Sequence, residues 1–384
     1  MTFASSFLPL WDRAAEWARR VAMIREAKSF LYLSTYYIEY DRYGIELLEA
    51  LLAARHRGVA VNLLIDGFGQ TLGGVLMSSR SKAALASLLD GLRAAGAIVT
   101  IYRPGRRVQR VLGGGQHVKI QLSEAGEAIF GSSNVTRASF EGWNEYSVAL
   151  RGPVVTDLLE SYRQIGGSVD ESHLSRLRQV SSGAAAADLP LDYWLCNPNA
   201  LQSGFGPLWW QGRNVVSDRL IEMLDSARES AWITSFYFKP VESLLAALLR
   251  AAGRGVKVEV HHSHRDALPT TDLAWIAAAA NYGRLLNGGV RIYENRHGEH
   301  SKIMLIDESW VAFGSYNFED AAHDRLAEAM LASRDRRAVE PALSIFEELR
   351  RHPDNALVTA QSLASLPARL KLKRAVLGRF KRWM

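Results

Sequence analysis

The strongest constraint on the fold of this 384-residue chain is an internal repeat. An aromatic and β-branched run at 29–38 resembles one at 230–238, and both patterns are typical of strands. Each run is followed by periodic leucines that end at a glycine, at 44–58 and 241–255, which predicts a helix. A strand, a second helix and a glycine-bounded strand then follow in both copies. The sequence therefore predicts two similar α/β units.

The order strand, helix, strand, helix, strand predicts largely parallel strands with helices against the sheet. We expect two pseudo-symmetric halves at 1–170 and 202–350, each a mixed, largely parallel sheet flanked by helices. The segment 171–201 contains SSGAAAADLP and is expected to be a linker between the halves. Residues 351–384 are expected to form a basic amphipathic tail.

The composition excludes several classes of protein. The single cysteine, Cys196, excludes an internal disulfide and a cysteine-based zinc site. No apolar stretch approaches the ~20 residues of a membrane-spanning helix. The N-terminal apolar run has no basic region before it and is followed by Asp12 and Glu16, a poor pattern for a signal peptide. We therefore expect a cytoplasmic protein that is soluble or peripheral to a membrane.

A histidine motif closes each repeat: HVKIQLSE starts at His117, and HSKIMLID starts at His300. Both motifs alternate in the way that is typical of a strand, where side chains two positions apart share a face. His117 is therefore expected to share a face with Lys119, and His300 with Lys302.

Acidic, hydroxyl and amide side chains follow at matched positions in the two copies. The pairs are Glu124 and Asp307, five residues after each lysine; Ser132 with Asn134 and Ser315 with Asn317, in Gly-Ser-x-Asn turns; and Glu145 and Glu328, 11 residues after each asparagine. Serine and asparagine in a glycine-containing turn supply hydrogen bonds to a ligand that approaches the backbone closely.

Two histidines, two lysines and two asparagines suit a phosphodiester. Lysine and amide groups neutralise and orient the non-bridging oxygens. One imidazole can attack phosphorus while the other protonates the leaving oxygen. The carboxylates of Glu124 and Asp307 would hold the imidazoles in the required tautomer. This chemistry requires neither a metal nor a cofactor, and we expect none.

Together the two motifs resemble the H-x-K-x-x-x-x-D…G-S/G-x-N signature of the phospholipase D superfamily, over roughly 25–150 and 225–335. The resemblance implies an active site between the two halves and a phosphohistidine intermediate, with His117 as the nucleophile and His300 as the general acid. The departure is Glu124, because the family usually has aspartate at this position.

The resemblance also implies roles for the other matched residues. Phosphate binding is implied for Lys119, Lys302, Asn134 and Asn317, and orientation of the opposite site for Glu145 and Glu328. The superfamily contains lipid phosphatidyltransferases, phospholipases and nucleases, so the fold alone does not name the substrate.

Three features favour a phospholipid substrate. The tail at 367–384 has seven Lys or Arg and no acid, and its apolar residues fall on one helical arc, which suits an anionic membrane surface. The loop at 67–85 is small and apolar before it becomes basic, and it could line an acyl entrance or be a simple surface loop. The order of elements resembles bacterial cardiolipin synthases without N-terminal membrane helices. We therefore expect a membrane-associated phosphatidyltransferase that uses an alcohol such as phosphatidylglycerol and is peripheral on the inner membrane.

Several alternatives stay open from the sequence. The same histidines could serve a phospholipase D or a metal-independent nuclease, and a lipid-binding protein with a relic site is a third possibility. The arginine-rich segment at 103–110 could steer lipid headgroups or a nucleic-acid backbone, or be a solvated loop. The HHSH run at 261–264 could bind a metal, touch the substrate or be structural. Because the net charge of +6 is accounted for by the tail, we expect no nucleic acid, and no protein partner is predicted.

Overall fold

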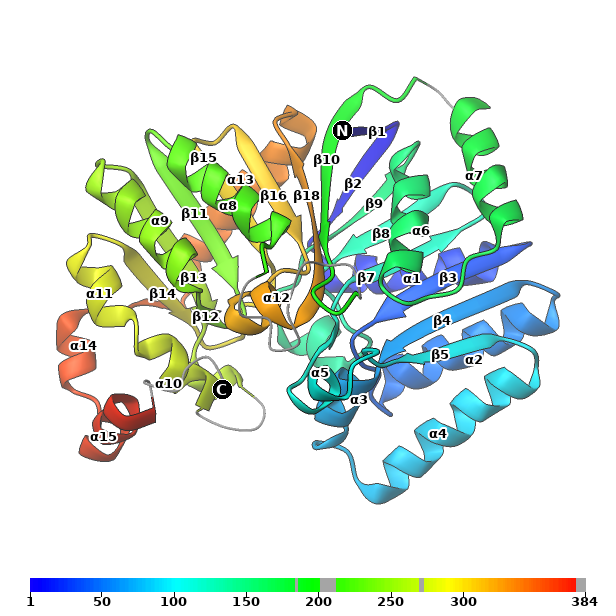
Figure 1. The fold of residues 1–384 in the computed structure, drawn as a ribbon, viewed down its shortest axis with the longest axis horizontal. Coiled ribbons are helices and arrows are strands. Elements are labelled where there is room, and N and C mark those ends of the chain that lie inside the picture. The colour runs from blue at the N-terminus through cyan, green and yellow to red at the C-terminus, as the bar shows by residue number, and fades with distance from the viewer. Residues whose placement is uncertain (184–185, 201–211, 269–272, 378–384) are drawn as a thin grey trace.

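The computed structural model of the chain describes residues 1–183, 186–200, 212–268 and 273–377. Figure 1 shows two β-sheets side by side, each with helices packed against it. One apolar core contains buried residues of both sheets, and each half has a further core beneath its own helices. The two halves are therefore joined by hydrophobic burial as well as by the chain that connects them.

The first sheet carries the first histidine motif. In spatial order its strands are β2 (Ser6–Leu10), β9 (Ser147–Arg151), β8 (Glu127–Gly131), β7 (Lys119–Ser123), β3 (Phe30–Thr35), β4 (Ala60–Asp66) and β5 (Ile98–Tyr102). All of β3 and nearly all of β4 is buried, which explains their almost continuous apolar sequences. The parallel strands β3, β4 and β5 are connected through α2 (Arg42–His56) and α4 (Ser79–Ala94).

The second sheet repeats this order and extends it at both edges. In spatial order its strands are β1 (Thr2–Ala4), β10 (Leu189–Cys196), β18 (Leu326–Ser333), β16 (Trp310–Gly314), β15 (Ile303–Ile306), β11 (Ser230–Ser235), β13 (Lys257–Ser263), β14 (Arg291–Asn295) and β19 (Asn355–Leu357). The equivalence extends to single hydrogen bonds. Ser34 Oγ accepts from Ile120 N at 3.0 Å, and Thr234 Oγ1 accepts from Ile303 N at 2.9 Å. The predicted pair of α/β halves is confirmed.

The expectation of largely parallel sheets is wrong, although their mixed character is confirmed. Only β3, β4 and β5 pair in parallel in the first sheet, whereas β7, β8, β9 and β2 form antiparallel pairs. The reason is the short turn between β7 and β8, because a connection of a few residues can join only antiparallel strands. The alternation of apolar residues indicates a strand but not its direction.

Helices cover the faces of the two sheets. Besides α2 and α4, they are α1 (Arg13–Glu26), α3 (Gly67–Gly74), α5 (Arg107–Val111), α6 (Val154–Gln164), α7 (Glu171–Gly183), α8 (Val215–Ser226), α9 (Glu242–Gly253), α10 (Leu273–Ala279), α11 (Tyr282–Asn287), α12 (Asp320–Asp324), α13 (Arg336–Arg351), α14 (Ala360–Ala364) and α15 (Ala368–Leu377). Several begin at a side-chain cap: Asp41 accepts from Gly44 N in α2, and Asn214 accepts from Ser217 N in α8.

The segment that connects the halves is more structured than a plain linker. Residues 171–201 contain helix α7 and strand β10, and β10 pairs with β18 in the second sheet. The N-terminal residues also join the halves, because β1 pairs with β10 while β2 pairs with β9. Buried residues of this connection lie in the core that the two sheets share and in the core of the second half.

The C-terminal segment packs partly on the body of the second half. After α13, strand β19 adds to the edge of the second sheet, and α15 lies against α10. Leu370 is buried, whereas Leu372 and Val376 are exposed. Part of the apolar arc predicted for 367–384 therefore contacts protein, and residues 378–384 lie outside the described part of the chain. No described helix is long and apolar enough to cross a membrane.

Candidate active site

Backbone hydrogen bonds between the halves position both histidines. The short strand β6 (Gly115–Gln116) pairs with β18 of the other half, and His117 N donates to Ala327 O at 2.8 Å. In the mirrored arrangement, His300 N donates to Asn144 O at 2.8 Å. Each histidine is therefore fixed by the segment that follows the asparagine turn of the opposite half.

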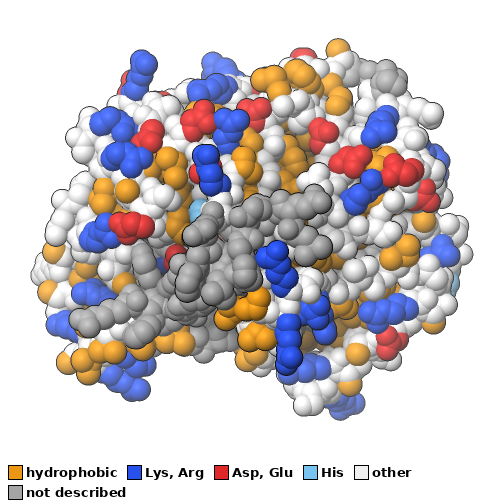
Figure 2. All heavy atoms as spheres, in the orientation of Figure 1, with side chains coloured by type: hydrophobic (Ala, Val, Ile, Leu, Met, Phe, Trp, Pro, Cys, Tyr) orange, Lys and Arg blue, Asp and Glu red, His pale blue; other side chains and the backbone are white. Residues whose placement is uncertain are grey.

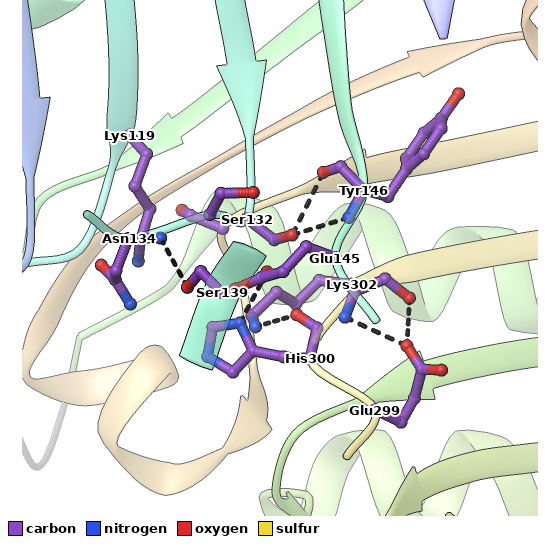
Figure 3. Close-up of polar contacts among 12 residues, drawn as sticks. Lys119, Ser132, Asn134, Ser139, Glu145, Tyr146, Glu299, His300 and Lys302 are labelled. Atoms are coloured by element: carbon purple, nitrogen blue, oxygen red, sulfur yellow. Dashed lines mark hydrogen bonds and ion pairs between the residues drawn. The ribbon is translucent and has the colours of Figure 1, made fainter. Parts of the chain in front are cut away.

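A glutamate from the opposite half holds each imidazole. His117 Nδ1 lies 3.0 Å from Glu328 Oε1, and His300 Nδ1 lies 2.7 Å from Glu145 Oε2 (Figure 3 shows the second pair). Both glutamates are completely buried. Each glutamate directly follows the residue whose carbonyl oxygen accepts from the backbone N–H of the histidine. One short segment therefore sets both the position of the histidine and the rotation of its ring. Glu145 and Glu328, for which an orienting role is expected, each lie within hydrogen-bond distance of the histidine of the opposite half.

The surroundings of His117 also determine its tautomer. Its Nδ1 lies 3.1 Å from the carbonyl oxygen of Ser315, which can only accept a hydrogen bond. Nδ1 therefore carries the proton, and the lone pair of Nε2 is left for chemistry. Burial raises the pKa of Glu328 to about 8. A proton on Glu328 would sit on Oε2, beside Ser315 Oγ, so Oε1 can accept from the imidazole in either state.

The lysines are buried next to the imidazoles. Lys119 Nζ donates to His117 O at 2.7 Å, and Lys302 Nζ donates to His300 O (Figure 3). Burial lowers the pKa of Lys119 well below its usual range and that of Lys302 to about 8. Burial, followed by the charges of Lys119 and Lys302, also lowers the pKa of His117. Lysines of both halves therefore lie close enough to His117 to act on its imidazole.

The asparagines face the same volume with unsatisfied amide groups. Within the described residues, Asn134 Oδ1 and Asn317 Oδ1 are buried and have no hydrogen-bond partner. Buried polar atoms are normally paired, so each unpaired amide oxygen marks a polar group that could bind a ligand. An amide that rotates about its last bond presents an N–H₂ group to a phosphodiester oxygen.

The serines of the Gly-Ser-x-Asn turns do not face the substrate volume, which corrects their expected role in substrate binding. Ser132 Oγ accepts from Tyr146 N at 2.9 Å and donates to Tyr146 O at 3.1 Å (Figure 3). Ser315 Oγ accepts from Ala329 N at 3.0 Å and donates to Glu328. Both hydroxyls instead anchor the backbone beside the orienting glutamates.

The expectation that Glu124 and Asp307 hold the imidazoles is wrong. Glu124 accepts hydrogen bonds from Lys28 N at 2.6 Å and Phe30 N at 3.2 Å. Asp307 accepts from Glu229 N at 2.8 Å and from two neighbouring backbone N–H groups. The seven residues from each histidine to its acid span about 23 Å along an extended strand, so the acid cannot reach back to the imidazole. These two acids accept hydrogen bonds from the backbone at the start of β3 and of β11.

Aromatic rings around the histidines were missed by the sequence reasoning. The ring of Tyr36 meets His117 edge-on at 4.7 Å, and Phe236 meets His300 in the same way at 4.7 Å. Trp143 also stacks on His300 at 5.0 Å. The signal in the sequence is the aromatic doublet that ends the first strand of each repeat, because the first ring of each doublet contacts a histidine.

Asp66 is a second functional candidate that the sequence reasoning missed. Its buried carboxylate accepts from Gln116 N at 2.8 Å and from Gly69 N at 2.7 Å, so it holds both β6 and the start of α3. Burial raises its pKa to about 7. Asp66 therefore supports the segment that carries His117.

The HHSH run is built into the second sheet. The ring of His261 stacks on Tyr293 at 4.6 Å, and His262 Nε2 lies 2.5 Å from the hydroxyl of Tyr282, which donates to Glu294. Among the described residues, no group of three His, Cys, Asp or Glu is arranged to hold a metal ion. A structural role accounts for the contacts of this run.

Together, the two mirrored halves and the paired histidine, lysine and asparagine residues define a two-motif protein of the phospholipase D type. A sequence profile of the family described as "Cardiolipin synthase, PLD-like domain" matches residues 21–164 and 220–350, so the chain belongs to this family. The matched segments contain both histidine motifs, and the recognition of the superfamily from these motifs is confirmed.

Individual relatives agree with this assignment. The chain is 27% identical over 325 residues to cardiolipin synthase B of Escherichia coli K12, covering 82% of this chain and 72% of that protein. It is 28% identical to cardiolipin synthase A of Pseudomonas syringae pv. syringae, covering 81% of this chain and 61% of that protein. The fold matches the phosphatidylserine synthase of Haemophilus influenzae with a TM-score of 0.72 at 13% identity, over 100% of this chain and 95% of that one.

Proposed function

We propose that the protein is a phosphatidyltransferase of the cardiolipin synthase type. It would cleave a phospholipid phosphodiester and transfer the phosphatidyl group to an alcohol such as phosphatidylglycerol. The observation that carries this proposal is the crossed arrangement in which Glu328 holds His117 and Glu145 holds His300. The names of the E. coli and P. syringae relatives support a phospholipid substrate.

The proposed first step forms a bond between His117 Nε2 and phosphorus. The bond from phosphorus to the leaving alcohol breaks, and that oxygen takes a proton from His300 Nε2. Burial lowers the pKa of His300 to about 4, so the free site holds a neutral ring. An anionic phosphodiester favours the charged imidazole, which raises this pKa when the substrate binds. Lys119 and Lys302 would neutralise the non-bridging oxygens.

In the second step His300 acts as a general base and His117 is the leaving group. Neutral His300 Nε2 removes the proton of the acceptor alcohol, whose oxygen attacks phosphorus as the bond to His117 breaks. The enzyme returns to its starting state, and the number of phosphodiester bonds is unchanged. Water in place of the alcohol would give phosphatidic acid, so exclusion of water decides between transfer and hydrolysis.

We also propose that residues 367–384 contact an anionic membrane surface. The support is that Leu372 and Val376 are exposed on α15 and that basic residues surround them. Such a segment suits peripheral binding at an anionic surface. The contact of Leu370 with the body would then hold α15 in place rather than compete with the membrane.

The proposal is tested with the purified protein, EDTA, and vesicles of phosphatidylglycerol and phosphatidylcholine, followed by lipid mass spectrometry. We expect cardiolipin from the wild type and from the control His56→Ala, whose side chain is exposed on α2. His117→Ala and His300→Ala should each lose at least about 10³-fold in rate, because neither step can proceed without both imidazoles. Phosphatidic acid as the only product would replace transfer by hydrolysis. Unchanged lipids together with cleavage of DNA would overturn the proposal.

The order of the histidines is tested with a nitrophenyl phosphodiester, whose leaving group needs no proton. We expect His300→Ala to accumulate a phosphorylated peptide that contains residue 117, because the step that releases the phosphoryl group lacks its base. No such peptide is expected in His117→Ala. A phosphorylated peptide that contains residue 300 would reverse the two roles.

A further inference from the structure

Helix α3 lies between the candidate active site and an exposed surface. Its glycines pack on two aromatic rings next to the site: a Cβ added at Gly69 would lie 2.5 Å from the ring of Tyr36, and one at Gly73 would lie 2.4 Å from the ring of Tyr37. Tyr36 in turn touches His117. The far face of α3 is therefore about 10 Å, one helix diameter, from the wall of the active site.

The far face of α3 is apolar and open to solvent. It continues onto α5, because a Cβ added at Gly113, just after α5, would lie 3.0 Å from the ring of Phe68 in α3. Apolar residues scattered singly on a surface need no explanation, but a group of large aliphatic side chains beside a cleft indicates an interaction site. The exposed side chains, with their exposed fractions, are Leu72 (47%), Val75 (66%), Leu76 (49%) and Val111 (74%).

Basic residues surround these aliphatic side chains. The segment 67–117 contains seven Lys or Arg and a single acid, Asp90, although the body of the protein is nearly neutral. Figure 2 shows Lys and Arg side chains next to hydrophobic ones over this part of the molecule. Five of the basic residues are exposed and form no ion pair with a carboxylate in the part of the chain that the structure describes: Arg80, Lys82, Arg103, Arg107 and Arg110. Arg110 instead donates to the carbonyl oxygens of Pro104 and Gly105, so the other four have guanidinium or ammonium groups that are open to a ligand.

We propose that this α3–α5 surface, made of Leu72, Val75, Leu76, Val111, Arg80, Lys82, Arg103 and Arg107, docks on an anionic lipid bilayer. Aliphatic side chains flanked by unpaired basic residues match the acyl boundary and the phosphate layer of such a membrane. Nucleic acid would be attracted by the arginines but would leave the leucine and valine side chains without apolar partners. Binding to the bilayer requires no turnover and therefore does not depend on the proposed reaction.

Docking through this surface places the active site at the membrane. An amphipathic element sinks about 5–10 Å into the headgroup region, which brings the layer of lipid phosphates close to the wall that contains Tyr36. In Figure 1, α3 and α15 both lie toward the lower edge of the molecule, on different halves. One bilayer would thus contact both halves through α3 and α15.

The test is flotation of the full chain with vesicles of phosphatidylcholine, with or without one-third phosphatidylglycerol. We expect Arg103→Ala/Arg107→Ala to weaken binding to the anionic vesicles on the order of thirtyfold, since each basic residue near such a surface strengthens binding by about fivefold. Leu72→Ser/Val75→Ser/Leu76→Ser should weaken it by at least about tenfold. The matched control is Arg176→Ala/Val180→Ser on α7, which exposes one basic and one aliphatic residue at the opposite edge.

A second measurement separates docking from folding and from chemistry. Hydrolysis of a soluble nitrophenyl phosphodiester should stay at the wild-type rate in all three variants, because none of the changed residues touches the site. Vesicle binding of the α3–α5 variants equal to that of the control would overturn the proposal. Loss of binding to single-stranded DNA with vesicle binding intact would also overturn it and assign the surface to nucleic acid. If the wild type does not hydrolyse the soluble phosphodiester, this result would count against the proposed function and would leave the docking result unchanged.

Discussion

The two imidazoles of the site are held in different ways, although the chain repeats itself around them. His117 Nδ1 has two acceptors, Glu328 and the carbonyl oxygen of Ser315, whereas the acceptor of His300 Nδ1 is Glu145. Burial opposes ionisation of Glu145, but His300 and Lys302 outweigh it and lower the pKa of Glu145 to about 2. Glu145 is therefore an ionised partner that stabilises a charged imidazole. This difference suits His117 as the neutral nucleophile and His300 as the acid.

We expect Glu145→Gln to be far more damaging than Glu328→Gln. The first change removes a buried negative charge from His300 and allows the wrong tautomer, which costs about 10³-fold in kcat. The second leaves an amide oxygen and the Ser315 carbonyl to accept from His117 Nδ1, so a loss on the order of tenfold is expected. Steady-state kinetics on vesicles, with the thermal midpoint as a control for folding, measures both. Equal losses of kcat in the two variants would contradict the different roles assigned to Glu145 and Glu328.

At the scale of elements, the acid that ends each histidine motif belongs to the sheet and not to the cleft. Asp307 follows β15 in a turn where it and Glu308 have positive φ values of 49° and 50°, and its carboxylate caps the start of β11. Backbone N–H groups outweigh the effect of burial and lower its pKa. The same position tolerates glutamate in the first half, because Glu124 reaches the N–H groups at the start of β3.

We expect Asp307→Ala to lower the free energy of unfolding by about 1–3 kcal/mol, with kcat unchanged within about twofold. Because the folded state lowers the pKa of Asp307, its contribution is fully present above the unfolded value and is lost as the pH falls through the folded value. Urea unfolding at neutral pH and at pH 3 measures this, and the difference between wild type and variant should shrink in acid. A loss of kcat comparable to that of His300→Ala would return Asp307 to the catalytic machinery.

At the scale of the whole molecule, the two halves share one apolar core. Phe313 of β16 lies fully buried in the core that contains residues of both sheets, and its ring meets Tyr146 of the first half edge-on at 5.4 Å. The backbone pairing of β6 with β18 crosses the same boundary. Since the groups of the candidate active site come from both sides of this boundary, the site exists only when the halves are packed together.

We expect Phe313→Ala to cost about 3–5 kcal/mol of unfolding free energy, because it leaves a cavity between the sheets. Phe3→Ala in β1, where the side chain is 40% exposed, is the matched control and should change stability far less. Tryptophan fluorescence and far-ultraviolet circular dichroism should report a single coincident transition for the wild type. Two separate transitions would show that the halves unfold independently.

The repeat, the two α/β halves and the paired histidine, lysine and asparagine residues could all be predicted from the sequence. They depend on local patterns: strand and helix periodicity, and side chains two positions apart on one strand. The equal spacing that singled out Glu145 and Glu328 is also a property of the chain alone.

The partners of the imidazoles depended on the tertiary structure. Glu124 and Asp307 are near the histidines in sequence but are carried away along an extended strand, whereas Glu145 and Glu328 arrive from the opposite half. Strand direction and the exposed face of α3 likewise depend on how elements meet. A sequence records which side chains share a local face, but only the packing of distant segments decides which of them touch.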